Sequence, residues 1–166
     1  MATRDNLSVA FTGESMANRK YTAFAKKAQA DGFPQIAKLF RAAAAAETVH
    51  ALTHLRVMEG VKSTGENLQV AIEGEGYEFK EMYPKFLDEA RKERNQAAVQ
   101  TFDNALKVEK VHHALYTEAL KTQAAGKDLP ATKIFVCSVC GNTVYGQPPA
   151  ECPVCGSGSK MFDEIA

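Results

Sequence analysis

The sequence predicts a mainly α-helical protein, with a four-helix bundle followed by a small metal-binding domain. Two observations carry this prediction. The tetrad Glu47-Thr48-Val49-His50 recurs later in the chain as Glu109-Lys110-Val111-His112. All four cysteines fall close to the C-terminus, from Cys137 onward, where they form two Cys-x-x-Cys pairs. Paired Glu-x-x-His motifs on helices are typical of bundles that hold two metal ions.

The overall composition excludes several classes of partner. Of the 166 residues, 45% are hydrophobic, which is enough for a packed core, and 20 basic residues balance 20 acidic ones. A neutral chain gives no reason to expect a nucleic acid or an anionic membrane as partner. No apolar run approaches the roughly 20 residues needed to cross a bilayer, and residues 1–8 lack the apolar core of a signal peptide. We therefore expect a cytoplasmic protein with no nucleic-acid or membrane partner.

Four stretches have apolar residues at helical spacing. The predicted helices are Asn6–Ala30, Pro34–Met58, a third from residues 73–76 to Glu93, and Asn95–Ala124. Gly32 and Pro34 form a stop and restart between the first two helices, and Gly126 follows the fourth at a common capping position.

A long connection is predicted between the second and third helices, over residues 60–76. It contains a possible helix start at Ser63 to Glu66. A connection of this length suits a crossover that lets the two helices run parallel. From the change in composition near residues 126–130, we expect a bundle domain over residues 1–129 and a second domain over residues 130–166.

Each half of the predicted bundle offers one lone glutamate and one Glu-x-x-His motif. Residues at i and i+3 share a helix face, so both side chains of the motif can reach one point. The lone glutamates are Glu14, which precedes Glu47, and Glu78, which precedes Glu109 at a similar separation. With His50 and His112 they make a carboxylate-rich set, which suits iron or manganese.

Three neighbouring residues leave alternatives open. His54 lies one turn beyond His50, and we favour a hydrogen-bonded structural histidine there over a ligand. His113, at i+4 from Glu109, is the alternative to His112. Glu81 has no carboxylate counterpart in the first half, where Ala17 stands; it is either an additional ligand or a surface residue. Pro84 removes a helical hydrogen bond to Lys80 and predicts a local bend beside Glu81.

The C-terminal cysteines form a separate predicted metal site. Cys137 and Cys140 form one pair, Cys152 and Cys155 form the other, and a glycine follows each pair. In a reducing compartment this spacing indicates a metal site and not two disulfides. Four thiolates suit a tetrahedral iron or zinc ion, and the spacing alone leaves both metals open.

These motifs resemble those of the rubrerythrin family over nearly the whole chain. The similar stretches are residues 11–21, 46–52 and 77–84, together with the cysteine pairs. The resemblance implies a ferritin-like four-helix bundle with a non-haem di-iron centre. A small rubredoxin-like β domain would follow, with one iron bound by four cysteines; structural zinc is the alternative.

The resemblance also implies roles for individual residues. The bridging ligands would be Glu47 and Glu109, and the terminal ligands would be Glu14, Glu78 and His112. His50 and Glu81 would exchange on the first iron as its oxidation state changes, since ferric iron favours an added anionic oxygen. Tyr21 and Tyr83 would provide hydrogen bonds near the site.

The activity implied by the resemblance is reduction of hydrogen peroxide to water, in protection against oxidative stress. Electrons would pass through the four-cysteine iron from an external NAD(P)H-dependent reductase, because no flavin or nucleotide fingerprint occurs in the sequence. A homodimer or small oligomer is expected, in which the tail of one subunit approaches the di-iron site of the other. The alternative is a ferroxidase or iron-handling protein with a structural zinc-binding tail.

Overall fold

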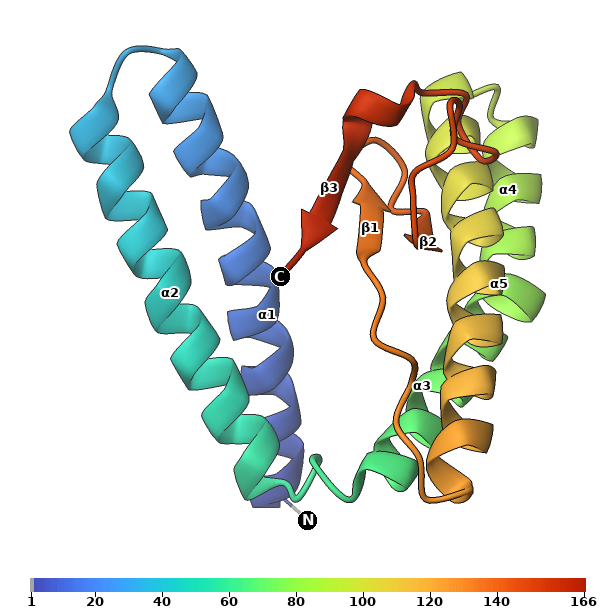
Figure 1. Ribbon diagram of the computed structural model, residues 1–166. Coiled ribbons are helices and arrows are strands. Elements are labelled where there is room, and N and C mark those ends of the chain that lie inside the picture. Colours follow the sequence, from blue (N-terminus) through green and yellow to red (C-terminus); the bar gives the residue numbers. More distant parts are fainter. Residues whose placement is uncertain (1) are drawn as a thin grey trace. The chain divides into compact units, whose positions relative to one another are not determined.

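The computed structural model describes residues 2–166, which are mainly helical with one small sheet (Figure 1). The helices are α1 (Ala2–Ala30), α2 (Pro34–Val57), α3 (Thr64–Tyr77), the π-helix η1 (Glu78–Met82), α4 (Tyr83–Lys92), α5 (Gln96–Ala124) and the short 3₁₀ helix η2 (Ser159–Met161). The strands are β1 (Ile134–Cys137), β2 (Thr143–Tyr145) and β3 (Phe162–Ile165). The chain forms two compact units, one ending at Lys62 and one beginning at Ser63. Within residues 2–166, none of the helices combines the length and apolar character needed to cross a membrane.

The first unit is a hairpin of α1 and α2, which lie side by side (Figure 1). Alanine favours the helical conformation, and its small side chain lets two helices approach closely. The residues buried in this hairpin are accordingly small: Ala25, Ala28, Ala37, Ala44 and Ala51. The turn between the helices contains Gly32 at φ +84°, a conformation that favours glycine.

One buried polar side chain ties the two helices of the hairpin together. Asn18 of α1 is 8% exposed, and its Nδ2 donates hydrogen bonds to the Ala44 carbonyl (2.6 Å) and to Thr48 Oγ1 (2.8 Å) of α2. Both acceptors lie close to Glu47 in sequence. The amide therefore fixes how α1 and α2 pack next to this candidate ligand.

The second unit begins with α3, η1 and α4, which follow one another without a break and pack along α5. The predicted connection over residues 60–76 is wrong, because α3 already begins at Thr64. The helix start within it is confirmed: Ser63 and Glu66 form a reciprocal capping box. One glycine of this stretch has a packing role. Gly76 is buried, and a Cβ added to it would lie 3.3 Å from the His113 ring.

The bend predicted beside Glu81 falls where the structure has the π-helix η1. Pro84 follows it in the first turn of α4 and cannot donate a backbone hydrogen bond. The Tyr83 amide donates to the Glu78 carbonyl, five residues earlier. A π-helix takes up one residue more per turn than an α-helix, and such segments are frequent at functional sites.

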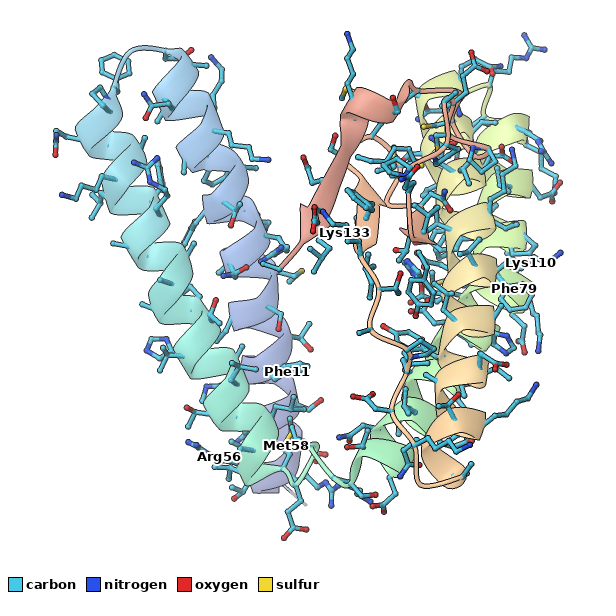
Figure 2. All side chains as sticks on the ribbon, in the orientation of Figure 1. Phe11, Arg56, Met58, Phe79, Lys110 and Lys133 are labelled. Carbon is cyan, nitrogen blue, oxygen red and sulfur yellow. The ribbon has the colours of Figure 1, made fainter. Side chains whose placement is uncertain are left out.

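The C-terminal part of the second unit is a three-stranded antiparallel sheet in the order β2-β1-β3. Its core is very small, with Cys137, Cys152 and Phe162 as the buried residues. Lys133, beside β1, pairs with Glu164 of β3 at 2.8 Å (Figure 2). So small a core buries little apolar surface, and a bound metal is a common source of the missing stability.

Replacing Asn18 by alanine should loosen the α1–α2 hairpin. The change removes two hydrogen bonds between the helices and leaves a small void, with an expected cost of about 1–3 kcal/mol. Amide hydrogen exchange of α1 and α2 would measure it. The matched control is Asn6→Ala on an exposed position of the same helix. Equal protection in the two variants would contradict a bridging role for Asn18.

Candidate metal centres

The first unit places Glu14 of α1 beside Glu47 and His50 of α2. His50 Nδ1 lies 3.0 Å from Glu47 Oε2 and 3.9 Å from Glu14 Oε1. One ligand atom from each side chain falls within 4.8 Å of the other two. A single metal ion could therefore contact all three, and this is the set that the first Glu-x-x-His motif predicted.

The charges in this first group are linked. A hydrogen bond shared by the two carboxyl groups is the main cause that raises the pKa of Glu14 and lowers the pKa of Glu47. The two carboxyl groups therefore lie close enough for their charges to act on one another. A cation between the two oxygens would relieve this repulsion, which is how the group fits a metal.

The second unit holds a group of the same shape. His112 Nδ1 lies 2.8 Å from Glu109 Oε2 on α5 and 3.9 Å from Glu75 Oε1 on α3. Burial, followed by a hydrogen bond with Glu109 and the charges of Glu109 and Glu78, raises the pKa of Glu75 to about 7. A nearby positive charge would stabilise the ionised form of such crowded, partly buried carboxylates. Hard oxygen ligands with one imidazole suit iron or manganese.

Each of the two units also contains a cluster of three aromatic rings, and the two clusters are similar. In the first unit, Tyr21 and Phe24 pack with Phe40 at ring distances of 5.6–6.3 Å. In the second unit the corresponding rings have the same range of distances: Tyr83, Phe86 and Phe102. Phe40 precedes Glu47 by seven residues, and Phe102 precedes Glu109 by seven. The chain therefore contains two copies of one helical arrangement.

The copies differ by one residue, and η1 accounts for it. Tyr21 follows Glu14 by seven residues, whereas Tyr83 follows Glu75 by eight. The π-helix lies between Glu75 and Tyr83 and takes up the additional residue. Both side chains can then keep the places that their counterparts have in the first unit.

Most of the predicted ligands are brought together, with one substitution. The groups contain Glu14, Glu47, His50, Glu109, His112 and the four cysteines. Glu75 occupies the place expected for Glu78. Glu78 lies nearby, half-buried, and its pKa is raised by burial and by the charge of Glu109. Glu81 is exposed and lies outside the group.

Sequence reasoning missed Glu75, although a signal was present. The separation between Glu75 and Glu109 is only one residue longer than the separation between Glu14 and Glu47. The separation between Glu78 and Glu109 is two residues too short, which is a poorer match. Because Glu75 falls within residues 60–76, the prediction of a connection there removed it from consideration.

The remaining predicted residues lie around the two groups. Burial, followed by the charges of nearby carboxylates including Glu78, raises the pKa of Tyr83, so its phenol stays protonated. Tyr21 packs in the aromatic cluster of the first unit. His113 is outside the second group, with its ring edge-on to Phe79 at 5.3 Å (Figure 2). His54 is outside the first group, though its charge acts on Glu14.

The four cysteines converge on one point in the C-terminal domain. Their sulfurs approach in pairs, Cys137 to Cys155 at 3.7 Å and Cys140 to Cys152 at 3.6 Å. A metal with tetrahedral bonds of about 2.3 Å would set its sulfurs about 3.8 Å apart, so the arrangement fits one ion. Burial opposes the charged form of Cys155, but hydrogen bonds with Ser157 lower the pKa of this thiol to about 6. Burial raises the pKa of Cys140.

Replacing Glu75 by glutamine should weaken metal binding in the second unit, because the amide cannot supply an anionic ligand. We expect a loss of affinity for Mn²⁺ of at least about tenfold, measured by titration of the metal-free protein. Glu81→Gln makes the same change on an exposed residue six positions later and should bind Mn²⁺ like the unchanged protein. Equal affinities in the two variants would exclude Glu75 as a ligand.

Comparison with known proteins agrees with this arrangement. The rubrerythrin family matches residues 5–120, and the rubredoxin-like domain of rubrerythrin matches residues 135–163. Rubrerythrin-2 of Clostridium acetobutylicum is 36% identical over 174 residues, which cover 96% of this chain and 95% of that protein. Nigerythrin of Nitratidesulfovibrio vulgaris is 38% identical over 175 residues, with 97% and 85% covered.

Solved structures show the same relationship. Nigerythrin in its fully reduced, all-ferrous state superimposes with a TM-score of 0.59 at 34% identity, covering 98% of this chain and 86% of that one. Its mixed-valence state gives a TM-score of 0.58 at 35% identity. The predicted fold class is thereby confirmed: ferritin-like helices followed by a rubredoxin-like domain, with a di-iron site and a four-cysteine iron site. The chain belongs to the rubrerythrin family.

Proposed function

We propose that this protein is a non-haem di-iron peroxidase that reduces hydrogen peroxide to water and protects against oxidative stress. The observation that carries the proposal is the presence of two Glu/Glu/His groups and a four-cysteine group on one chain. The first two groups would each bind one iron. The four-cysteine iron can carry one electron at a time. A chain that only stored iron would have no use for such a relay.

The protein's own residues supply the charge that two irons require. Glu14, Glu47, Glu75 and Glu109 offer four negative charges, which balance two ferrous ions. Two ferrous ions held by these residues would provide the two electrons for reduction of hydrogen peroxide, and two protons from solution would complete two water molecules. Tyr83, which keeps its proton beside these carboxylates, can donate a hydrogen bond to an oxygen of the substrate. Tyr21 is proposed to do the same from the first unit.

Glu78 is the best-placed residue for the additional carboxylate that the sequence analysis assigned to Glu81. It belongs to η1, its charge and that of Glu109 act on one another, and it is half-buried. Ferric iron favours an added anionic oxygen, so Glu78 would serve the oxidised state. His50 remains the ligand proposed to be released on oxidation, since its side chain is 55% exposed and has room to move.

The proposed cycle needs partners outside the chain. An external NAD(P)H-dependent reductase would return electrons to the four-cysteine iron. The cysteines are all free in the structure, which suits the reducing cytoplasm. A homodimer or small homo-oligomer is proposed as the working form. A large closed shell, seen by light scattering, would instead favour the iron-handling alternative.

The substrate preference can be tested by stopped-flow mixing. The visible spectrum of the iron-loaded protein is recorded before reduction, because a ferric four-cysteine site is coloured whereas a zinc site is colourless. The protein is then reduced. Hydrogen peroxide or oxygen is then added. We expect peroxide to reoxidise the protein at least about tenfold faster than oxygen. Equal or faster reoxidation by oxygen would contradict the peroxidase and favour a ferroxidase.

The role of Glu78 can be tested against Glu81, three residues away in the same π-helix. Glu78→Gln should leave the helices folded but lower peroxide turnover roughly 10- to 100-fold, the usual loss when a residue that supports a metal site is changed. Glu81→Gln should leave turnover unchanged, because Glu81 is exposed. The opposite result, with Glu81→Gln impaired and Glu78→Gln active, would return the role to Glu81.

A further inference from the structure

The four-cysteine domain touches the metal-binding helix of its own chain at two points. Strand β2 lies beside α5 (Figure 1). Gly141, directly after Cys140, faces Val108 of α5: a Cβ built on Gly141 would lie 3.8 Å from Val108 Cγ1. One helical turn further along α5, His112 Nε2 lies 3.0 Å from Thr143 Oγ1. Val108 is 2% exposed, so this face of α5 is well covered.

The direction of the hydrogen bonds at Thr143 follows from its other partner. The Thr143 hydroxyl donates to the Gly141 carbonyl at 3.3 Å. A hydroxyl has a single proton, so toward His112 the oxygen acts as acceptor. His112 Nε2 must then carry the proton and donate it. The other ring nitrogen, Nδ1, faces Glu109 at 2.8 Å and is the atom directed at the metal group.

We infer that Thr143 is a positioning residue for the metal site: it holds His112 with the proton on Nε2 and with Nδ1 directed at the metal. The inference rests on the proposed function only in taking Nδ1 of His112 as a metal ligand. Histidine ligands usually donate their second N–H to a fixed acceptor, which sets the orientation and tautomer of the ring. Here the acceptor comes from the rubredoxin-like domain, three residues after Cys140.

The contact distinguishes the two histidines of the paired motifs. The His112 side chain is 26% exposed and is held through both ring nitrogens. The His50 side chain is 55% exposed, and within residues 2–166 its described polar contacts are those of Nδ1 with Glu14 and Glu47. Thr143 therefore makes His112 the fixed histidine. Thr143 also connects the two kinds of metal group through two hydrogen bonds: His112 Nε2 donates to the Thr143 hydroxyl, and this hydroxyl donates to the Gly141 carbonyl.

The inference can be tested by NMR on the full-length chain loaded with Zn²⁺, which is diamagnetic and binds the same ligand types. In the unchanged protein, the His112 ring N–H should be on Nε2 and exchange slowly with water. Thr143→Val keeps the shape but removes the acceptor, so exchange of this proton should become roughly 3- to 10-fold faster. Thr143→Ser restores a hydroxyl and should restore slow exchange.

A control separates positioning from a general loss of structure. Thr117→Val removes a hydroxyl that donates to the His113 carbonyl on the same helix and should leave the His112 signal unchanged. Nuclear Overhauser effects between Val108 and Gly141, measured in all variants, report whether the four-cysteine domain stays beside α5. The inference is overturned if Thr143→Val leaves exchange unchanged, if Thr143→Ser fails to restore it, or if the ring proton is on Nδ1. None of these readouts depends on peroxide turnover, so the proposed function can fail independently.

Discussion

The repulsion between neighbouring carboxylates is the constraint on which the rest of this structure depends. Each unit holds two glutamates close enough to share a proton, Glu14 with Glu47 and Glu75 with Glu109. Without a cation, one member of each pair must stay protonated or repel the other. The helices supply the rigidity that keeps these groups together, through the Asn18 amide in the first unit and the close approach at Gly76 in the second. The fold thus maintains an arrangement that a bound cation would stabilise.

The two units repeat one design, and the differences between them indicate where function enters. The tyrosine and phenylalanine clusters match, and the histidine–carboxylate distances are similar, at 3.0 Å in the first unit and 2.8 Å in the second. Among residues 2–166, the π-helix occurs in the second unit, where it adds one residue between Glu75 and Tyr83 and includes Glu78. In the same unit, His112 contacts the cysteine domain through Thr143. An additional carboxylate and a fixed histidine would make the two metals inequivalent, as a redox reaction with separate steps requires.

Much of this could be predicted from the sequence, because the decisive signals are local. The repeated Glu-x-x-His tetrads, the lone Glu14 and the Cys-x-x-Cys pairs predicted nine of the residues that the structure brings together in its three groups. The error at Glu75 was also local in origin. The stretch over residues 60–76, which contains four glycines, was predicted to be a connection. The capping box at Ser63 and packing against α5 make it helical from Thr64 onward. Glycine's low helix propensity is a weak preference that tertiary packing overrides.

The contact between Thr143 and His112 could not be predicted in this way. The two residues are 31 positions apart, and nothing in their local patterns indicates that they meet. The π-helix is similar: Pro84 predicted an irregularity, but the additional residue became visible only when the tyrosine clusters of the two units were compared. Long-range packing therefore decides the details that make the two halves different.

A crystal structure of the iron-loaded protein, with iron located by its anomalous scattering, tests the central claim most directly. We expect three irons per chain: two among the glutamates and histidines, and one on the four cysteines. Glu75 and His112 Nδ1 should lie within bonding distance of one iron, about 2.0–2.2 Å, and Glu81 should contact none. An iron bound by Glu81, or a Glu75 carboxylate turned away from the metal, would contradict it.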